Sequence, residues 1–235
     1  MGDEERIALV TGGNKGIGFE ICFGLASGGV QVILTSRDED KGLKACRQLS
    51  ERGVRVEYQR LDVTLPATLD TAFEFIRSKF GKLDILINNA GIFPKSEPSA
   101  LRIQKEVFME VFETNAAGPL FISQRLIPLL KKSRNGKIIN VSSGMGSLHD
   151  MGGGYPSYRI SKAALNAVTR ILADELKELD ISVNSVCPGW VKTDMGGSNA
   201  PRSVQQGASG IVKLALMEKG IPTGKFLRDG AEIPW

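Results

Sequence analysis

The stretch Ile7-Ala8-Leu9-Val10-Thr11-Gly12-Gly13-Asn14-Lys15-Gly16-Ile17-Gly18 decides the fold. Its first four residues form an apolar run, which is typical of a strand buried on both faces of a parallel sheet. Glycines follow, and then an amphipathic segment that continues through Leu25. A strand, a glycine-rich turn and a helix in this order direct free backbone N–H groups and the positive end of a helix dipole toward a phosphate. The stretch therefore predicts a phosphate-binding turn.

The spacing of this turn is Gly-x-x-x-Gly-x-Gly, which differs both from the commoner Gly-x-Gly-x-x-Gly fingerprint and from the P-loop. A turn that only reverses the chain is the alternative, but the flanking strand and helix favour the phosphate site. Glycines allow the backbone to approach a pyrophosphate closely because no Cβ stands in the way. The residues expected to bind a dinucleotide here are Gly12, Asn14, Lys15, Gly16, Ile17 and Gly18.

Apolar strands and helical segments alternate along the rest of the chain. Strands are expected at 31–37, 54–58, 83–87, 136–143, 181–187 and 225–227, and helices at 39–52, 69–80, 104–132, from 156 onward and at 212–217. This alternation predicts an α/β fold, with a single doubly wound parallel sheet of the Rossmann type and helices on both faces. The length of 235 residues, with 42% hydrophobic residues, fits one domain over 1–235.

Composition argues against several other classes of protein. The net charge of +4 comes from scattered Lys and Arg, so no nucleic-acid partner is expected. Three distant cysteines and one histidine lack the spacing of a disulfide framework or a metal site, so no metal is expected. No apolar run reaches 18 residues, and the start, Met1 to Arg6, is acidic rather than signal-like. We therefore expect a cytoplasmic protein with no membrane partner.

The end of the second strand bears on coenzyme choice. Arg37 lies 19 residues beyond Gly18, where an acidic residue would hold the ribose hydroxyls of NAD and an arginine would accommodate the 2′-phosphate of NADP. Lys15 in the glycine turn adds a second positive charge. NADP(H) is therefore expected in preference to NAD(H). The alternative is that Arg37 is a solvated cation next to Asp38, the N-cap of the following helix.

Polar residues also follow other predicted strands. Asp62 and Val63 come after the third strand, and Asn89, Ala90 and Gly91 come after the fourth. Ligands of doubly wound sheets sit beyond the carboxyl ends of the strands, so the Asp62 carboxylate is expected to accept from an adenine amine. Turn chemistry alone would also explain the Asn-Asn-Ala-Gly segment.

Tyr158 and Lys162 are four residues apart in a predicted helix, so they lie on one face of it. A nearby ammonium favours the phenolate and would lower the pKa of the phenol toward the working pH, which suits a proton donor or base. Ser143 ends the fifth strand 15 residues earlier and would reach the same edge. Alternatively, Tyr158 packs in a core and Lys162 is a solvated surface charge.

Asn115 is a polar residue within the apolar segment 104–132. An amide in such a helix is usually a satisfied hydrogen-bonding group of the core. The alternative is a helical kink that holds a water molecule.

Together these motifs resemble the short-chain dehydrogenase/reductase family over nearly the whole chain, and within it the NADPH-dependent carbonyl reductases. The motifs are Thr11–Gly18, Leu61–Val63, Asn88–Gly91, Asn115, Ser142-Ser143, Tyr158-x-x-x-Lys162, Cys187–Met195 and Trp235. The resemblance implies that Tyr158 is the acid/base and Ser143 holds the substrate oxygen. It implies that Lys162 lowers the tyrosine pKa and binds the nicotinamide ribose, and that Asn115 keeps a relay water near it.

The resemblance also implies a nicotinamide site, a substrate site and an assembly. Residues expected at the nicotinamide are Pro188, Gly189, Val191 and Thr193, next to a substrate loop at about 194–205. The carbonyl reductases carry a long insertion between the serine and the tyrosine, which is absent here. In the family that insertion covers the surface used for association, so a homodimer or homotetramer is expected.

The expected function is hydride transfer between NADP(H) and a carbonyl or alcohol substrate, that is, a ketone or aldehyde reductase. One alternative is an NAD(P)-dependent dehydrogenase of a specific alcohol, sugar or 3-oxoacyl substrate. Another, from a different class, is a non-catalytic NADP(H)-sensing protein.

Overall fold

The computed structural model describes residues 5–97 and 99–235, so most of the acidic start falls outside the described residues. Within these ranges one sheet of eight strands has the order β3-β2-β1-β4-β5-β6-β7-β8. The strands are β1 (Ile7–Val10), β2 (Gln31–Ser36), β3 (Glu57–Arg60), β4 (Ile85–Asn88), β5 (Gly136–Val141), β6 (Ile181–Val186), β7 (Phe226–Arg228) and β8 (Ala231–Glu232). All neighbouring strands are parallel except β7 and β8. The predicted doubly wound sheet is confirmed, and the short antiparallel β8 at its edge was not predicted.

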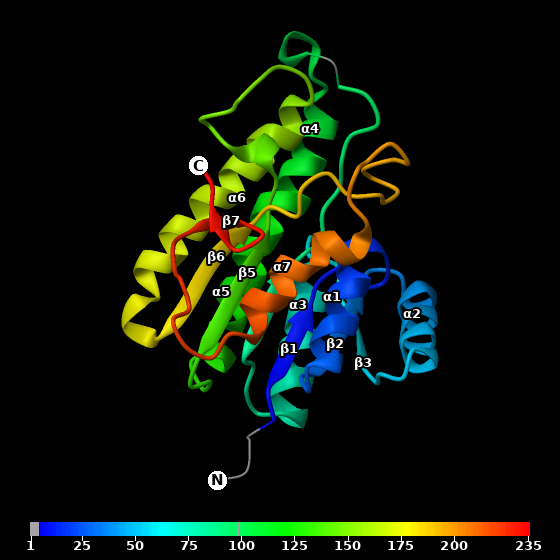
Figure 1. Ribbon diagram of the computed structural model, residues 1–235, viewed down its shortest axis with the longest axis vertical. Coiled ribbons are helices and arrows are strands. Elements are labelled where there is room, and N and C mark those ends of the chain that lie inside the picture. Colours follow the sequence, from blue (N-terminus) through cyan, green and yellow to red (C-terminus); the bar gives the residue numbers. More distant parts are fainter. Residues whose placement is uncertain (1–4, 98) are drawn as a thin grey trace.

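Helices cover both faces of the sheet (Figure 1). The helices are α1 (Gly16–Ser27), α2 (Glu39–Glu51), α3 (Pro66–Lys79), α4 (Lys105–Phe112), α5 (Gly118–Leu130), α6 (Pro156–Glu175) and α7 (Val204–Leu216). One core lies between the sheet and α1, α2 and α7, and the other between the sheet and α3, α5 and α6. Side chains alternate along β1 between the two cores: Ala8 and Val10 enter the first, and Ile7 and Leu9 the second. This explains why the strand reads as a continuous apolar run.

The boundaries of α7, of β3 and of the helical segment 104–132 differ from the predicted ones. α7 begins at Val204, eight residues earlier than expected, because the Ser203 hydroxyl and the Gln206 side chain form a capping box. The segment 104–132 is one continuous helical path, but a π-helical turn at Glu113–Ala117 separates α4 from α5. β3 occupies Glu57–Arg60 rather than 54–58. Pairing with β2, which places Ser36 opposite Arg60, sets its position.

Strand register brings the carboxyl ends of the central strands level with one another. Val10 of β1 pairs with Ile87 of β4, and Val141 of β5 pairs with Val186 of β6. The residues that follow these strands therefore share one edge of the sheet. In the described ranges, no helix has the length and apolar character needed to cross a membrane.

Candidate active site

The glycine turn after β1 has the conformation that the sequence predicts. Gly12 and Gly16 have φ values of 62° and 56°, in the left-handed region that favours glycine. A Cβ on Gly18 would overlap the carbonyl oxygen of Gly12 and come within 2.5 Å of the Asn89 side-chain nitrogen. α1 begins at Gly16, so its first backbone N–H groups lie in the turn. These features fit the phosphates of a dinucleotide. Without Cβ atoms in the turn, a phosphate can come close to its backbone N–H groups.

Hydrogen bonds between the residues that follow β1 and β4 hold this turn in place. The amide nitrogen of Asn89 donates to the carbonyl oxygens of Thr11 at 2.9 Å and Gly12 at 3.1 Å. The Thr11 hydroxyl accepts the backbone N–H groups of Asn89 and Ala90, both at 2.9 Å. Thr11 is a residue that the sequence analysis did not assign to the site. The signal that could have found it is the one used for Asp62 and Asn89, a polar residue directly after a buried strand.

The two predicted cations of the coenzyme site have different surroundings. Arg37 is exposed at the end of β2, and its carbonyl oxygen accepts from Arg60 at 3.3 Å. Lys15 is also exposed, and its Nζ lies 2.7 Å from the Asp194 carboxylate. Asp38 caps α2, as expected, by accepting from the Lys41 N–H at 3.1 Å. Hydrogen bonding with Lys41 lowers the pKa of Asp38. The Asp38 carboxylate therefore binds Lys41 at the start of α2, next to Arg37 in the chain.

Three further residues predicted to bind the coenzyme, Asp62, Val63 and Gly91, follow the carboxyl ends of β3 and β4. One oxygen of the half-buried Asp62 accepts from the Thr64 N–H and hydroxyl at 3.0 and 2.7 Å. Val63 is buried and packs against Gly118, where a Cβ would come within 3.0 Å of it. Gly91 brings its backbone beside Lys162, since a Cβ there would lie 3.6 Å from Nζ.

Tyr158, Ser143 and Lys162 meet at one place. Tyr158 is 8% exposed in the first turn of α6, and the nearby Ser143 side chain acts to lower the pKa of its phenol. The Nζ atom of Lys162 lies 5.7 Å from the centroid of the Tyr158 ring and donates to the Val141 carbonyl oxygen at 2.8 Å. Lys162 is 4% exposed, so the alternative of a solvated surface lysine is wrong. The spacing of four in α6 brings the phenol and the ammonium onto one face of the helix.

The expected lowering of the tyrosine pKa is wrong for this structure. Burial raises the pKa of Tyr158 to about 12, Ser143 acts in the opposite direction, and Cys187 adds to the rise. Burial lowers the pKa of Lys162 to about 8. Desolvation disfavours the charged form of each group, and for the phenol it outweighs the lowering effect of Ser143. The phenol of Tyr158 is therefore protonated at neutral pH.

Asn115 is completely buried in the π-helical turn between α4 and α5. Its side-chain oxygen accepts from the Ile92 N–H at 2.8 Å, and its nitrogen donates to the Ile92 carbonyl at 2.9 Å and to Ser161 Oγ at 3.1 Å. The amide therefore ties the segment after β4 to α6, as a hydrogen-bonding group of the core would. The π-helical turn also makes the helix irregular at this point, and the water molecule of the alternative hypothesis stays a prediction.

The segment after β6 lies over the glycine turn. A Cβ on Gly16 would be 3.3 Å from the Thr193 methyl group, and buried Val191 bridges to Arg202 in the backbone. Pro188 is buried and Gly189 has a φ of 79°. Arg202 forms two hydrogen bonds of 2.7 and 2.6 Å with Asp229. The predicted substrate loop is therefore held at its far end by an ion pair.

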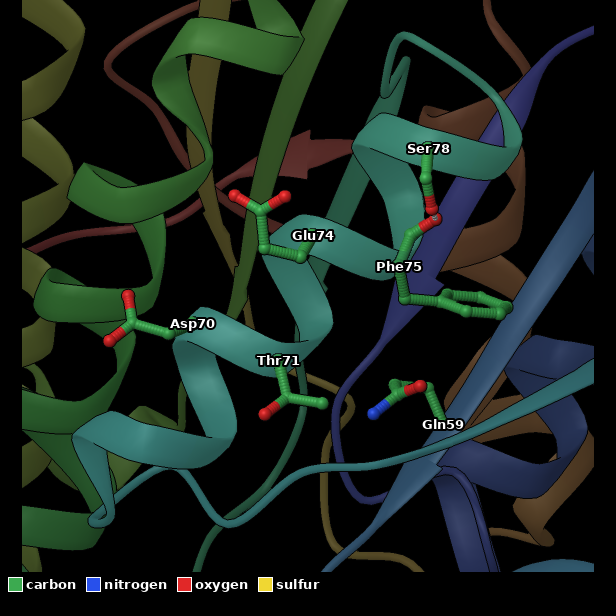
Figure 2. A pocket seen from close by; sticks show the side chains of 6 residues that line it. All are labelled: Gln59, Asp70, Thr71, Glu74, Phe75 and Ser78. Carbon is green, nitrogen blue, oxygen red and sulfur yellow. Dashed lines mark hydrogen bonds between the residues drawn. The ribbon is translucent and has the colours of Figure 1, made fainter.

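A surface hollow of about 580 Å³ lies elsewhere, between β3 and α3 (Figure 2). Its lining residues are Gln59, Asp70, Thr71, Glu74, Phe75 and Ser78. They come from one strand and one helix at the edge of the sheet, not from the carboxyl ends of β4, β5 and β6. This hollow is therefore separate from the candidate active site.

The fold, with the glycine turn after β1 and the cluster of Tyr158, Ser143 and Lys162, defines a dinucleotide-binding oxidoreductase of the α/β class. The family described as short chain dehydrogenase matches residues 6–203. A relative called short-chain dehydrogenase/reductase 1, from Saponaria officinalis, is 38% identical over 294 residues, covering 99% of this chain and 97% of the relative. The chain belongs to the short-chain dehydrogenase family, which confirms the resemblance seen in the sequence.

Two further relatives carry names that describe an activity. Rat carbonyl reductase [NADPH] 1 is 32% identical over 282 residues, with 100% of both chains covered. The structure of the carbonyl reductase Sniffer of D. melanogaster has a TM-score of 0.90 and 30% identity, covering 99% of this chain and 100% of the other. The rat alignment is 47 positions longer than the 235 residues of this chain. This difference agrees with the expected lack of a long insertion.

Proposed function

We propose that this protein is an NADPH-dependent reductase of ketones or aldehydes. The observation that carries the proposal is the convergence of a buried phenol, a serine hydroxyl and a buried lysine at the carboxyl end of β5. The names of the rat and fly relatives support a carbonyl substrate, and the rat name supports NADPH.

The coenzyme would lie across the carboxyl ends of the strands. The turn Gly12–Gly18 would hold the phosphates, and Arg37 with Lys15 would bind the 2′-phosphate. Asp62, Val63 and Asn89–Gly91 would line the adenosine side, and Pro188, Gly189, Val191 and Thr193 the nicotinamide side. For Lys15 to contact a phosphate, its ion pair with Asp194 must rearrange.

The residues of α6 and the end of β5 would carry out the proton chemistry. When bound, reduced coenzyme supplies a hydride to the carbonyl carbon. Ser143 would donate a hydrogen bond to the substrate oxygen, and Tyr158 would protonate that oxygen as negative charge develops on it. Lys162, below its pKa of about 8, would place a positive charge next to the phenol. Asn115 would support this lysine from the π-helical turn.

The titration of Tyr158 favours reduction over oxidation at neutral pH. Because burial raises the phenol pKa to about 12, the group is ready to donate a proton and is seldom available as a base. Alcohol oxidation would therefore need a more alkaline medium.

The test is NADPH oxidation by purified protein with a panel of aldehydes, diketones and quinones, run beside NADH and beside alcohols with NADP⁺. We expect turnover with at least one carbonyl and a preference for NADPH. Turnover only with one alcohol, sugar or 3-oxoacyl substrate would favour a specific dehydrogenase. Tight NADPH binding without any turnover would favour a sensor and contradict the proposal.

We further propose that the protein is a cytoplasmic homo-oligomer that associates through α4, α5 and α6. These helices carry exposed apolar side chains: Met109 and Phe121 on α4 and α5, and Ile160 and Ile171 on α6, each 44–55% exposed. Light scattering after gel filtration should give a multiple of 25.4 kDa. Phe121→Lys should shift the mass toward the monomer, whereas Leu43→Lys on α2 should not. A monomeric wild-type protein would refute the association.

A further inference from the structure

The catalytic helix α6 begins in an unusual way. Its N-cap residue, Tyr155, has a φ of 51°, which is rare for an aromatic residue. The ring of Tyr155 packs at a tilt of 42° against Phe93, with centroids 4.5 Å apart, so it is not placed to cap the helix. Such a conformation persists only where the surroundings enforce it, and it is common at functional sites.

Glu97, from the segment between β4 and α4, supplies the cap instead. It is 5% exposed, and its carboxylate accepts from the Ser157 N–H at 2.7 Å and from the Ser157 hydroxyl. Its own carbonyl oxygen accepts from the Tyr155 N–H at 2.6 Å. A negative charge at this position is also favoured by the positive end of the α6 dipole. Glu97 therefore fixes the two residues on either side of Pro156.

The next residue along α6 is Tyr158. Phe93, four residues before Glu97, packs edge-on against the Tyr158 ring with centroids 4.7 Å apart. The first turn of α6 is thus held from one segment at three points, Tyr155, Ser157 and Tyr158. Ser157 is completely buried, so loss of the carboxylate would leave its N–H and hydroxyl without their acceptor.

We propose that Glu97 is a positioning residue that sets the orientation of Tyr158 by capping α6 from a separate loop. This inference rests on the proposed role of Tyr158 in the reduction. A displacement of about 1 Å in a reacting group lowers a rate by up to about 100-fold. The segment between β4 and α4 therefore holds the proton donor in its orientation.

The test compares Glu97→Ala and Glu97→Gln with a matched control. Asp84→Asn removes a buried carboxylate that likewise accepts from a backbone N–H, that of Ile7 at 2.8 Å, and from the Ser133 hydroxyl at 2.5 Å. Asp84 precedes β4 and so lies at the opposite end of the sheet. All three variants should lose thermal stability.

Only the Glu97 variants should lose kcat. Glu97→Ala should lower kcat about 10- to 100-fold with KM for NADPH within about twofold, because coenzyme contacts lie elsewhere. Glu97→Gln should lose less, since its amide oxygen can still accept the Ser157 N–H. If Glu97→Ala does not fold, kcat of Glu97→Gln and of Ser157→Ala is compared with kcat of Asp84→Asn instead. Wild-type kcat in the Glu97 variants, or an equal loss in Asp84→Asn, would overturn the inference.

A second readout does not depend on turnover. The chain has three tyrosines, Tyr58, Tyr155 and Tyr158, so 3-fluorotyrosine labelling gives three ¹⁹F resonances that Tyr→Phe variants assign. The Tyr155 and Tyr158 resonances should shift or broaden in Glu97→Ala and stay in place in Asp84→Asn. An unmoved Tyr158 resonance would overturn the inference even if the wild type is an active reductase. If the wild type reduces no carbonyl, the proposed function fails while this resonance still decides the role of Glu97.

Discussion

The Nζ atom of Lys162 lies 5.7 Å from the centroid of the Tyr158 ring and is held by the carbonyl oxygen of Val141. The lysine is thereby tied to β5, while the phenol stays free to face Ser143 and the edge of the sheet. Burial moves the two pKa values in opposite directions, that of Lys162 down to about 8 and that of Tyr158 up to about 12, so both groups are protonated at neutral pH. The following experiments test what this arrangement does.

Tyr158→Phe should lower kcat by about 10²- to 10⁴-fold because only the proton donor is removed. NADPH affinity, measured by fluorescence titration, should stay nearly unchanged. Tyr155→Phe is the matched control, since its ring can still pack against Phe93 and it should keep most of the activity. Turnover like that of the wild type in Tyr158→Phe would end the acid assignment.

Arg37→Asp should weaken NADPH far more than NADH, by about 10-fold or more, because a charge-assisted contact to the 2′-phosphate becomes a repulsion. The measurement is KM for both coenzymes at low ionic strength. Arg134→Asp makes the same charge change just before β5, at the opposite end of the sheet, and should leave the ratio unchanged. An unaltered ratio in Arg37→Asp would leave Arg37 as a solvated cation.

Gly18→Ala should abolish tight coenzyme binding and lower the melting temperature, since the new Cβ would overlap the Gly12 carbonyl oxygen. Gly153→Ala is the control, because a Cβ there meets no atom of the described chain within 4 Å. Calorimetric titration with NADPH and thermal unfolding measure both effects. Unchanged binding in Gly18→Ala would mean that the turn yields at no cost and does not approach the phosphates closely.

The rate of reduction should fall as the pH rises through about 8. Burial lowers the pKa of Lys162 to about 8, so its positive charge is present below this pH and lost above it, while Tyr158 with a pKa of about 12 stays protonated. The log of kcat/KM should therefore be flat below pH 8 and decline by up to about one unit per pH unit above it. Lys162→Met should be slow at every pH and lack this limb. A wild-type limb that persists in Lys162→Met would assign it to another group.

Stability should rise between pH 8 and about 10 because two lysines are buried. Lys137, 3% exposed at the start of β5, donates to the Ala215 carbonyl oxygen at 3.0 Å, and burial lowers its pKa to about 8. The unfolded chain keeps its lysine protons up to about pH 10.5 and so binds more protons than the folded state in this window, which makes the unfolding free energy increase with pH.

Lys137→Met should reduce this slope by up to about 1.4 kcal/mol per pH unit, the limit for one proton. Urea unfolding at several pH values from 7 to 10 measures it, and Lys213→Met, an exposed lysine on α7, is the control. Equal slopes in wild type and Lys137→Met would show that Lys137 is protonated alike in both states. Above pH 10 the raised pKa of Tyr158 acts in the opposite direction, since only the unfolded phenol ionises there.

Local signals explain how much of the fold could be predicted. The apolar run Ile7–Val10, the glycines that follow it and the β-α alternation are properties of neighbouring residues, so they can be read without coordinates. The spacing of four between Tyr158 and Lys162 is also local, because a helix fixes which residues share a face. The motifs at the strand ends can also be predicted from the sequence, since all parallel strands have their carboxyl ends at the same edge of the sheet.

Other features depend on segments far apart in the chain. The capping of Ser157 by Glu97 joins residues 60 positions apart, and the bonds of Asn115 to Ile92 and Ser161 cross 23 and 46 positions. The pKa values of Tyr158 and Lys162 depend on burial, which the spacing of residues in the sequence does not reveal. The sequence by itself therefore determined the family and the doubly wound sheet, and it supplied the candidates for the reacting groups. Only the tertiary structure decided their protonation and what holds them, because desolvation and long-range hydrogen bonds exist only once the chain is packed.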